Sequence, residues 1–178
     1  MTPPITGRLE MVERAFDVDV SVDHHGWPNV VPNLEMTVRL AAEAALRACS
    51  YEPEKAELSV LMTDNRTIAD LNEKWRGKSG PTNVLSFSGE WEGSGPALLG
   101  DIVLAIEIVT AEAEAEGITV SDHVAHLIVH GVLHLLGHDH QTDSEANIME
   151  ALETKILETL GVSDPYVVDK KFLSRIIT

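Results

Sequence analysis

The first sixty residues of the chain carry two short strand-like patterns on either side of a longer helical one. Residues 16–22 (FDVDVSV) alternate apolar and polar side chains, which is typical of a strand at the edge of a sheet. Residues 34–49 repeat apolar side chains at helical spacing, and Asn33 stands where it can cap this helix. Residues 57–62 (ELSVLM) are typical of a second strand. We therefore expect a strand, a helix and a strand in this order.

A second helix is expected directly after this strand. Asp64 or Asn65 begins it, and Gly77 stands where a helix ends. One face of the helix carries the apolar side chains of Ile68, Leu71 and Trp75. The spacing predicts that all three belong to the hydrophobic core.

The next forty residues predict two strands separated by a loop. Residues 82–88 are typical of a short strand, and residues 90–100 are rich in Gly and Ser, which predicts a loop. Residues 100–109 (GDIVLAIEIV) are typical of a buried strand that runs into a helix ending at Gly117.

Two helices are expected in the C-terminal third of the chain. Ser121 can cap the first of them, which enters the segment HGVLHLLGHDH (residues 130–140), and Gly137 is placed to end it. Residues 143–160 predict the last helix, in which apolar side chains stand at helical spacing at Ile148, Leu152, Ile156 and Leu160.

Strands and helices are mixed without a strict alternation, which predicts an α+β fold. We expect a small mixed sheet of about four strands packed with about five helices. The length favours a single domain over residues 1–178, with a loose N-terminal lead-in at residues 1–14 and a tail of uncertain structure at residues 163–178.

Composition and charge narrow the class of protein. The 178 residues include a single cysteine, Cys49, which excludes an intrachain disulfide. No apolar run reaches the roughly 18 residues of a membrane span, and the N-terminus lacks the apolar core of a signal peptide. We therefore expect a cytoplasmic protein without a membrane partner. The formal net charge of −16 disfavours a polyanionic partner unless a basic patch or a bound cation provides a local phosphate site.

Residues 130–140 hold four of the chain's eight histidines. His130 and His134 stand one helical turn apart on the same face, so both can bind one metal ion. Gly137 can end the helix and turn the chain so that His140 approaches the same point. The spacing H-x-x-x-H-x-x-G-x-x-H is that of the zinc sites of metzincin-type enzymes. Three protein ligands leave a fourth position open, so we expect one catalytic Zn²⁺ ion at His130, His134 and His140.

Three neighbouring residues leave alternatives open. His138 competes with His140 as the third ligand, although the position of the glycine favours His140. His126 stands eight residues before His134, about 12 Å away along a straight helix, and is expected to be a neighbour of the site rather than a ligand. Asp139 either accepts a hydrogen bond from an imidazole or caps the turn.

The residue after the first histidine of the motif is Gly131. In zinc peptidases with the motif H-E-x-x-H, this position holds the glutamate that serves as general base. Loss of a general base costs about 10²–10⁴-fold in rate, which disfavours a peptidase. A metal ion can instead lower the pKa of its bound water and so provide a nucleophile without a protein base.

The segments LNEKWRGKSGPTNVLSF, LGDIVLAIE and HGVLHLLGHDH occur in an order that resembles one known family. They are similar to L-N-x-x-Y-R followed by P-T-D-V-L-S-F, to a G-D-I strand, and to the signature H-G-x-L-H-L-x-G-Y-D-H. These are the motifs of the YbeY family of bacterial metal-dependent endoribonucleases. The resemblance covers residues 30–161.

The resemblance implies both a site and a task. It implies metal ligands at His130, His134 and His140, an active-site arginine at Arg76, and Arg76 and His130 as the catalytic residues. The implied fold is α+β, with the metal-site helix beside the sheet. The implied task is cleavage of single-stranded RNA during 16S rRNA 3′-end maturation and small-subunit biogenesis. Small-subunit ribosomal proteins and the Era GTPase are the implied partners.

The chain departs from the family motifs at three positions. His138 replaces a tyrosine, which creates the ambiguity about the third ligand. Trp75 replaces another tyrosine, which is a milder change. Asn83 replaces an aspartate, and an amide keeps the hydrogen bonding but lacks the charge. Whether this position orients a metal ligand or caps the strand is therefore open.

Arg76 also has a chemical rationale of its own. A guanidinium binds a phosphate through two parallel hydrogen bonds, and Lys74 and Lys78 complete a small basic patch in an acidic chain. Trp75 can stack on a base, although its spacing favours the core. The alternative is that Lys74 and Arg76 only complement the C-terminal end of a helix.

The predicted function is metal-assisted cleavage of an RNA phosphodiester, in which Arg76 stabilises charge on the phosphoryl group. The ion either activates a bound water for hydrolysis or polarises a phosphoryl oxygen while the RNA 2′-hydroxyl attacks. One alternative is a zinc hydrolase of another substrate class, such as peptides. The other is a non-catalytic ribosome-assembly factor in which the metal ion only stabilises the helix end. The net charge of −16 favours this last alternative, because a free nuclease would gain from a basic surface.

Overall fold

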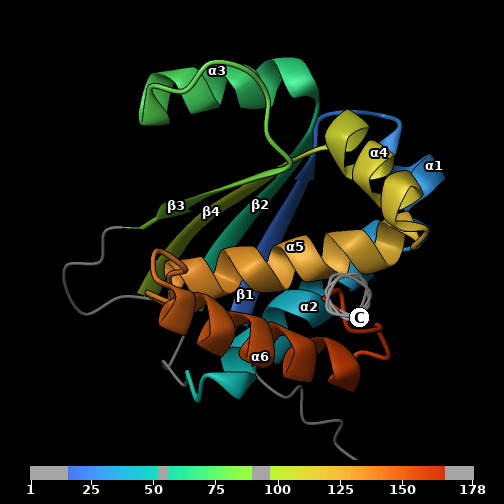
Figure 1. Cartoon of the computed structure of the whole chain (residues 1–178). Coiled ribbons are helices and arrows are strands. Elements are labelled where there is room, and N and C mark those ends of the chain that lie inside the picture. Colours follow the sequence, from blue (N-terminus) through green and yellow to red (C-terminus); the bar gives the residue numbers. More distant parts are fainter. Residues whose placement is uncertain (1–15, 52–55, 90–96, 167–178) are drawn as a thin grey trace, which may run out of the picture.

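The computed structural model of the chain describes residues 16–51, 56–89 and 97–166. Within these residues, four strands form one mixed sheet and six helices pack around it (Figure 1). The expected α+β class is confirmed, with one helix more than expected. The predicted lead-in at residues 1–14 lies outside the described residues, as does the predicted tail from residue 167 onward.

The sheet has the strand order β1-β2-β4-β3. Its strands are β1 (Phe16–Val22), β2 (Ala56–Thr63), β3 (Val84–Ser88) and β4 (Ala97–Ala105). β1, β2 and β4 are parallel, whereas β3 runs antiparallel to β4. The prediction that β1 lies at an edge is confirmed. The prediction of a loop up to Gly100 is wrong, because β4 already begins at Ala97 and Gly100 follows a bulge within it, where glycine is common.

The helices are α1 (Trp27–Val30), α2 (Leu34–Ala48), α3 (Asn65–Arg76), α4 (Ile106–Glu116), α5 (Val120–Leu135) and α6 (Asp143–Thr159). Asn33 precedes α2 as predicted, but its left-handed backbone (φ 58°) leaves its side chain without a capping hydrogen bond. Thr119 caps α5 in place of the predicted Ser121, because its side chain accepts a hydrogen bond from the backbone N–H of Asp122. No helix in the described part of the chain is long and apolar enough to cross a bilayer.

The core has two parts, one on each face of the sheet. Apolar side chains of β1, β2 and β4, such as Val18, Leu58 and Ile102, pack against α2, α5 and α6. On the opposite face, Val103 of β4 packs with Ile68 of α3. Figure 1 shows the result, with α3 on one side of the sheet and α5 and α6 on the other. The side chains of β4 therefore contribute alternately to both layers.

The prediction that Trp75 belongs to the core is wrong. Ile68, two turns earlier in α3, is fully buried, whereas Trp75 in the last turn is 63% exposed. The ring of Trp75 meets the ring of Phe87 on β3 at 6.3 Å between centroids. The helical period identifies the side of α3 that faces the sheet, but not how far the sheet extends beneath it.

The buried face of α6 is also shifted from the predicted one. Ile148 is 61% exposed, whereas the next residue, Met149, is buried. The buried positions of this helix are Met149, Glu153, Ile156 and Leu157. A glutamate therefore occupies a position in the core of the protein.

Candidate metal centre and cleft

α5 and the turn after it bring three histidines together. The Nε2 atoms of His130 and His134 are 3.0 Å apart. The ring centroid of His140 lies 5.7 Å from that of His130 and 5.0 Å from that of His134. One ring nitrogen of each histidine lies within 4.8 Å of the other two. This spacing suits one ion bound through nitrogen–metal bonds of about 2.0–2.1 Å.

Gly137 makes the return of the chain possible. α5 ends at Leu135, and Gly137 adopts a φ of 88°, a left-handed conformation that a side chain disfavours. The backbone N–H of His138 then donates to the carbonyl of Leu133 at 3.0 Å. The chain thereby folds back along the end of α5 and carries His140 to the two helical histidines.

In His130 and His134, the ring nitrogen that faces away from the cluster has an acceptor of its own. Nδ1 of His134 lies 3.0 Å from the backbone oxygen of His138, and Nδ1 of His130 lies 2.6 Å from Oε1 of Glu153. An imidazole that donates through Nδ1–H keeps a lone pair on Nε2. Two such lone pairs facing each other at 3.0 Å are suited to a cation between them.

The electrostatics of the cluster agree with this fit. Burial lowers the pKa of His134 below its usual value, and the neighbouring His130 and His140 lower it further. The ring is therefore neutral at pH 7, and a neutral imidazole is the form that binds a metal ion. Three nitrogen donors with one open position are the donor set of a catalytic zinc site.

The other two histidines near the motif lie outside this cluster. The ring of His138 faces Cys49, with 3.8 Å between Nε2 and Sγ, so only its backbone oxygen serves the cluster. His126 lies 3.5 Å from Oε2 of Glu153, which makes it a neighbour of the residue that contacts His130. Within the described residues, the histidines that could hold one ion together are His130, His134 and His140.

Asp139 caps the turn, which is one of the two alternatives considered for it. Its Oδ1 accepts from the backbone N–H of His140 at 2.8 Å, and its Oδ2 accepts from the side chain of Gln141 at 2.6 Å. The hydrogen bond from the backbone of His140 is the main reason that the pKa of Asp139 is lowered.

At Gly131, α5 packs closely on the sheet. A β-carbon at this position would lie 2.8 Å from Cδ1 of Ile102 and 3.1 Å from Oγ of Ser86. A glutamate here would have to enter the layer between α5 and the strands β3 and β4. A side chain at this position would therefore require Ile102 to shift, which disfavours the general base of an H-E-x-x-H peptidase here.

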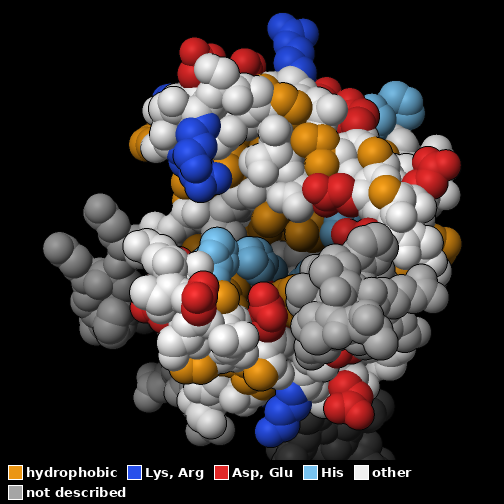
Figure 2. All heavy atoms as spheres, in the orientation of Figure 1, with side chains coloured by type: hydrophobic (Ala, Val, Ile, Leu, Met, Phe, Trp, Pro, Cys, Tyr) orange, Lys and Arg blue, Asp and Glu red, His pale blue; other side chains and the backbone are white. Residues whose placement is uncertain are grey.

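The histidine cluster opens into a cleft of about 540 Å³. The cleft is lined by Arg76 from the end of α3, by the three histidines, and by residues of β3 and its approach, namely Asn83, Val84, Leu85, Ser86 and Ser88. Figure 2 shows histidine side chains in a hollow between α3 and α5, with basic side chains near the end of α3 above it. The volume lies within the range of small-molecule sites and exceeds what a single ion needs. A substrate group can therefore lie between Arg76 and the histidines.

Comparison with known proteins identifies the family. The family profile described as Endoribonuclease YbeY matches residues 26–161, which is more than half of the chain. The chain belongs to the YbeY family. An endoribonuclease YbeY of Paramagnetospirillum magneticum is 44% identical over 157 residues, which cover 85% of this chain and 96% of the relative. An endoribonuclease YbeY of Parvibaculum lavamentivorans is 50% identical over 171 residues, which cover 90% of this chain and 85% of the relative.

A solved structure supports the fold independently. The solution structure of a Thermotoga maritima protein superimposes with a TM-score of 0.53 and 21% sequence identity. The match covers 89% of this chain and 95% of that protein. At this identity the likeness concerns the fold alone, and it agrees with the α+β arrangement described above.

The position at which this chain departs from the aspartate of the YbeY motif has a clear role in the structure. Oδ1 of Asn83 accepts from the backbone N–H of Val84 at 2.7 Å and so caps the start of β3. Its Nδ2 donates to the carboxylate of Glu112 on α4 at 3.1 Å. An aspartate would place a second carboxylate against Glu112. Asn83 therefore caps the start of β3 and also donates a hydrogen bond to Glu112.

Sequence reasoning missed Glu153 and Tyr166. Glu153 is fully buried, and the hydroxyl of Tyr166 donates a hydrogen bond to its Oε2. Burial raises the pKa of Glu153, but hydrogen bonds from His126, His130 and Tyr166 outweigh this effect and lower the pKa to about 2. The one available signal was the helical spacing of Glu153 from Met149, which places it on the buried face of α6.

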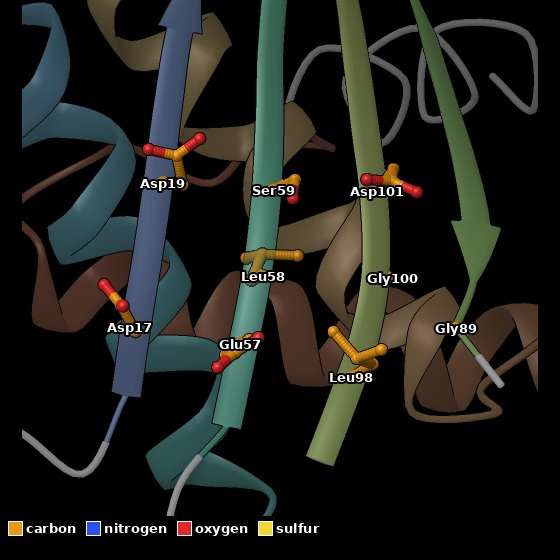
Figure 3. Close-up of a pocket in the computed structure, with 9 residues that line it drawn as sticks. All are labelled: Asp17, Asp19, Glu57, Leu58, Ser59, Gly89, Leu98, Gly100 and Asp101. Carbon is orange, nitrogen blue, oxygen red and sulfur yellow. The ribbon is translucent and has the colours of Figure 1, made fainter. Parts of the chain in front are cut away.

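Part of the acidic excess lies on the face of the sheet opposite α5. Four carboxylates line a shallow pocket there, those of Asp17, Asp19, Glu57 and Asp101. Figure 3 shows these side chains on β1, β2 and β4, with helices behind the strands. Salt screens exposed charges over about 8 Å at physiological ionic strength. Beyond that distance, these carboxylates act weakly on other charges.

Proposed function

We propose that the chain is a metal-dependent endoribonuclease that cuts single-stranded RNA, with one Zn²⁺ ion held by His130, His134 and His140. The observation that carries this proposal is that Arg76 and the histidine cluster line one cleft, in a chain of the YbeY family. A phosphodiester in this cleft would have a guanidinium on one side and the cation site on the other. Both charges favour the negative charge that develops on a phosphoryl group during cleavage.

Each residue of the cleft has a defined task in this proposal. A bound zinc ion would supply Lewis acidity toward the phosphodiester. His130 and His134 would hold the ion through Nε2, since their Nδ1 atoms already have acceptors. Arg76 would bind two phosphate oxygens through its guanidinium and orient the scissile group. Gly131 keeps α5 close to the sheet and contributes no general base.

We infer further that the RNA is ribosomal. In this reading the protein acts in the cytoplasm on the 3′ end of 16S rRNA during small-subunit biogenesis. Its partners would be small-subunit ribosomal proteins and the Era GTPase, as the motifs of the YbeY family imply. The net charge of −16 agrees with this part of the proposal, because a protein partner that brings the RNA would offset the excess of acidic residues.

Two substitutions test the catalytic part of the proposal. His134→Ala removes one nitrogen donor, so we expect loss of bound zinc by elemental analysis and loss of cleavage of a single-stranded RNA oligonucleotide. Arg76→Ala should keep its bound zinc, but its rate of RNA cleavage should fall by about 10²-fold or more, because the variant loses only the charge that stabilises the phosphoryl group. His25→Ala removes an exposed histidine outside the cluster and should change neither quantity.

The possible outcomes separate the three functions. Unchanged zinc content or unchanged cleavage in His134→Ala would contradict the proposal. If purified wild-type protein cuts no RNA and a chelator lowers its stability, the non-catalytic assembly factor is favoured. Chelator-sensitive degradation of a protein substrate would favour a zinc hydrolase of another class.

A further inference from the structure

We propose that Glu153 is a positioning residue that holds His130 in the tautomer protonated at Nδ1, so that Nε2 faces the metal centre. The inference rests on the metal centre of the proposed function. It concerns a residue of α6, outside both the histidine motif and the segment around Arg76.

Glu153 is unusual because its carboxylate is buried in the core of the protein. Glu153 is fully buried in the packing between α5 and α6, with Met149, Ile156 and Leu157 on the same helix face. A carboxylate in such surroundings costs free energy unless its oxygens accept hydrogen bonds. The residue must therefore be judged by what its two oxygens contact.

The first oxygen contacts the candidate ligand. Oε1 of Glu153 lies 2.6 Å from Nδ1 of His130, a length at the short end for a charge-assisted hydrogen bond. An ionised carboxylate has no proton to donate, so the proton of this bond belongs to Nδ1. The contact therefore selects the tautomer of His130.

The second oxygen has donors of its own. The hydroxyl of Tyr166, from the segment after α6, donates to Oε2 of Glu153. Nε2 of His126, one turn before His130 on α5, lies 3.5 Å from the same oxygen. Contacts on both oxygens fix the plane of the carboxylate and so the direction of its bond to His130. Three segments of the chain thus meet at one side chain.

The consequence for metal binding follows from the geometry of the ring. With the proton on Nδ1, Nε2 of His130 presents a lone pair 3.0 Å from Nε2 of His134. The other tautomer would direct a proton into the same space and block an ion. His134 has a backbone carbonyl as the corresponding acceptor, and Glu153 plays that part for His130. Loss of such a partner typically weakens metal affinity about 10–100-fold.

Glu153→Gln is the direct test. The amide nitrogen of glutamine can donate to Nδ1 and so favour the wrong tautomer, while the volume of the side chain is unchanged. We expect the dissociation constant for zinc, measured by competition with a chromophoric chelator, to rise about 10–100-fold. Glu158→Gln on the exposed side of the same helix is the matched control and should bind zinc like the wild type.

A second readout distinguishes positioning from a merely structural role. In the zinc-loaded wild type, NMR should show a downfield ring proton on Nδ1 of His130 that is protected from exchange. This protection should be lost in Glu153→Gln. A zinc-loaded wild type with the His130 proton on Nε2 would overturn the proposal. So would a Glu153→Gln variant in which only the unfolding free energy of the zinc-free protein falls.

Tyr166→Phe serves if Glu153→Gln fails to fold. It removes one hydroxyl and leaves the ring packing, and it should raise the zinc dissociation constant by a smaller factor than Glu153→Gln. An unchanged constant in Tyr166→Phe, together with an unprotected Nδ1 proton in the wild type, would also overturn the proposal. None of these measurements uses RNA. A protein that binds zinc in this way but cuts no RNA would keep this inference and refute the proposed function.

Discussion

The side-chain nitrogen of Asn83 lies 3.1 Å from a carboxylate oxygen of Glu112, and this contact joins the start of β3 to α4. The same carboxylate lies 2.8 Å from Nε2 of His123 on α5. One carboxylate thus links α4 to the start of β3 and to α5. This arrangement requires a hydrogen-bond donor at position 83, which an aspartate cannot provide when ionised.

Exchange of the two side chains tests this link. Asn83→Asp should lower the free energy of unfolding at pH 7 by about 1–2 kcal/mol, because a lost hydrogen bond is replaced by facing carboxylates. The double variant with Glu112→Gln restores an amide opposite a carboxylate and should recover most of the loss. Urea denaturation of the three proteins measures both effects. Equal losses in the single and double variants would contradict the assignment.

The two histidines that compete for the third ligand position should differ sharply in zinc binding. His140→Gln removes a ring from the cluster, so we expect most of the zinc affinity to be lost. His138→Gln changes only a ring that faces Cys49 and leaves the backbone oxygen that accepts from His134. Zinc titration calorimetry on both variants provides the comparison. Stronger loss in His138→Gln than in His140→Gln would reverse the ligand assignment.

Gly137 and Gly117 form a matched pair for testing the turn. Both have positive φ, 88° and 69°, and a β-carbon at either would meet no atom within 4 Å. Alanine at each position should therefore cost about 1 kcal/mol of stability through backbone strain alone. Gly137→Ala should also weaken zinc binding, because this turn carries His140, whereas Gly117→Ala should not. Equal zinc affinity in the two variants would separate the turn from the metal centre.

The sequence predicted the features that depend on local geometry. The spacing of His130 and His134 is fixed by the helical repeat, and Gly137 signals the turn, so the cluster with His140 could be anticipated from eleven residues. The tyrosine and glutamate behind the cluster could not, because α6 and the segment after it reach His130 only through tertiary packing. No local signal indicates which residue of a helix will meet a neighbour's ring.

Trp75 shows the same limit of local sequence patterns, because its spacing predicted burial and the structure exposes it. The helical period correctly aligned it with Ile68, yet the extent of the sheet beneath α3 is a property of the whole fold. The start of β4 at Ala97 was likewise not predicted, because residues 90–100 are rich in Gly and Ser, which predicts a loop, although Leu98 and Gly100 pair with β2. Periodicity predicts which way a side chain points, and packing decides what it meets.

The exposure of Trp75 leads to an expectation about RNA, which rests on the proposed function. Trp75 is 63% exposed next to Arg76 of the cleft, and Nζ of Lys74 lies 5.0 Å from its ring centroid. Stacking of a base on an aromatic ring contributes about 1–3 kcal/mol to single-strand binding. Trp75→Ala should therefore weaken binding of single-stranded RNA by that amount, measured by fluorescence anisotropy.

The free energy of unfolding is the control measurement for Trp75→Ala. Trp75→Ala should change the free energy of unfolding little, because most of the ring is already in solvent. Met36→Ala, at a methionine that is 58% exposed on α2, removes a comparable exposed side chain and should leave RNA binding unchanged. Similar RNA affinities in the two variants would exclude Trp75 as a stacking platform.

The stability of α3, which carries Arg76 to the cleft, should depend on pH through Asp64. Oδ1 of Asp64 accepts from the backbone N–H of Thr67 at 2.8 Å, and this hydrogen bond is the main reason that the pKa of Asp64 falls below 3.8. The folded protein therefore holds the ionised form more strongly than the unfolded chain. The resulting stabilisation is fully present above the unfolded pKa and is lost as the pH falls through the lower folded pKa.

The variant Asp64→Asn tests this dependence, because it keeps a capping acceptor but does not titrate. We expect the free energy of unfolding, measured by urea denaturation, to fall more in the wild type than in Asp64→Asn between pH of about 5 and 3. Asp70→Asn, which changes an exposed aspartate on the same helix, is the control and should behave like the wild type. Parallel pH profiles for the wild type and Asp64→Asn would show that the cap does not couple the helix to pH.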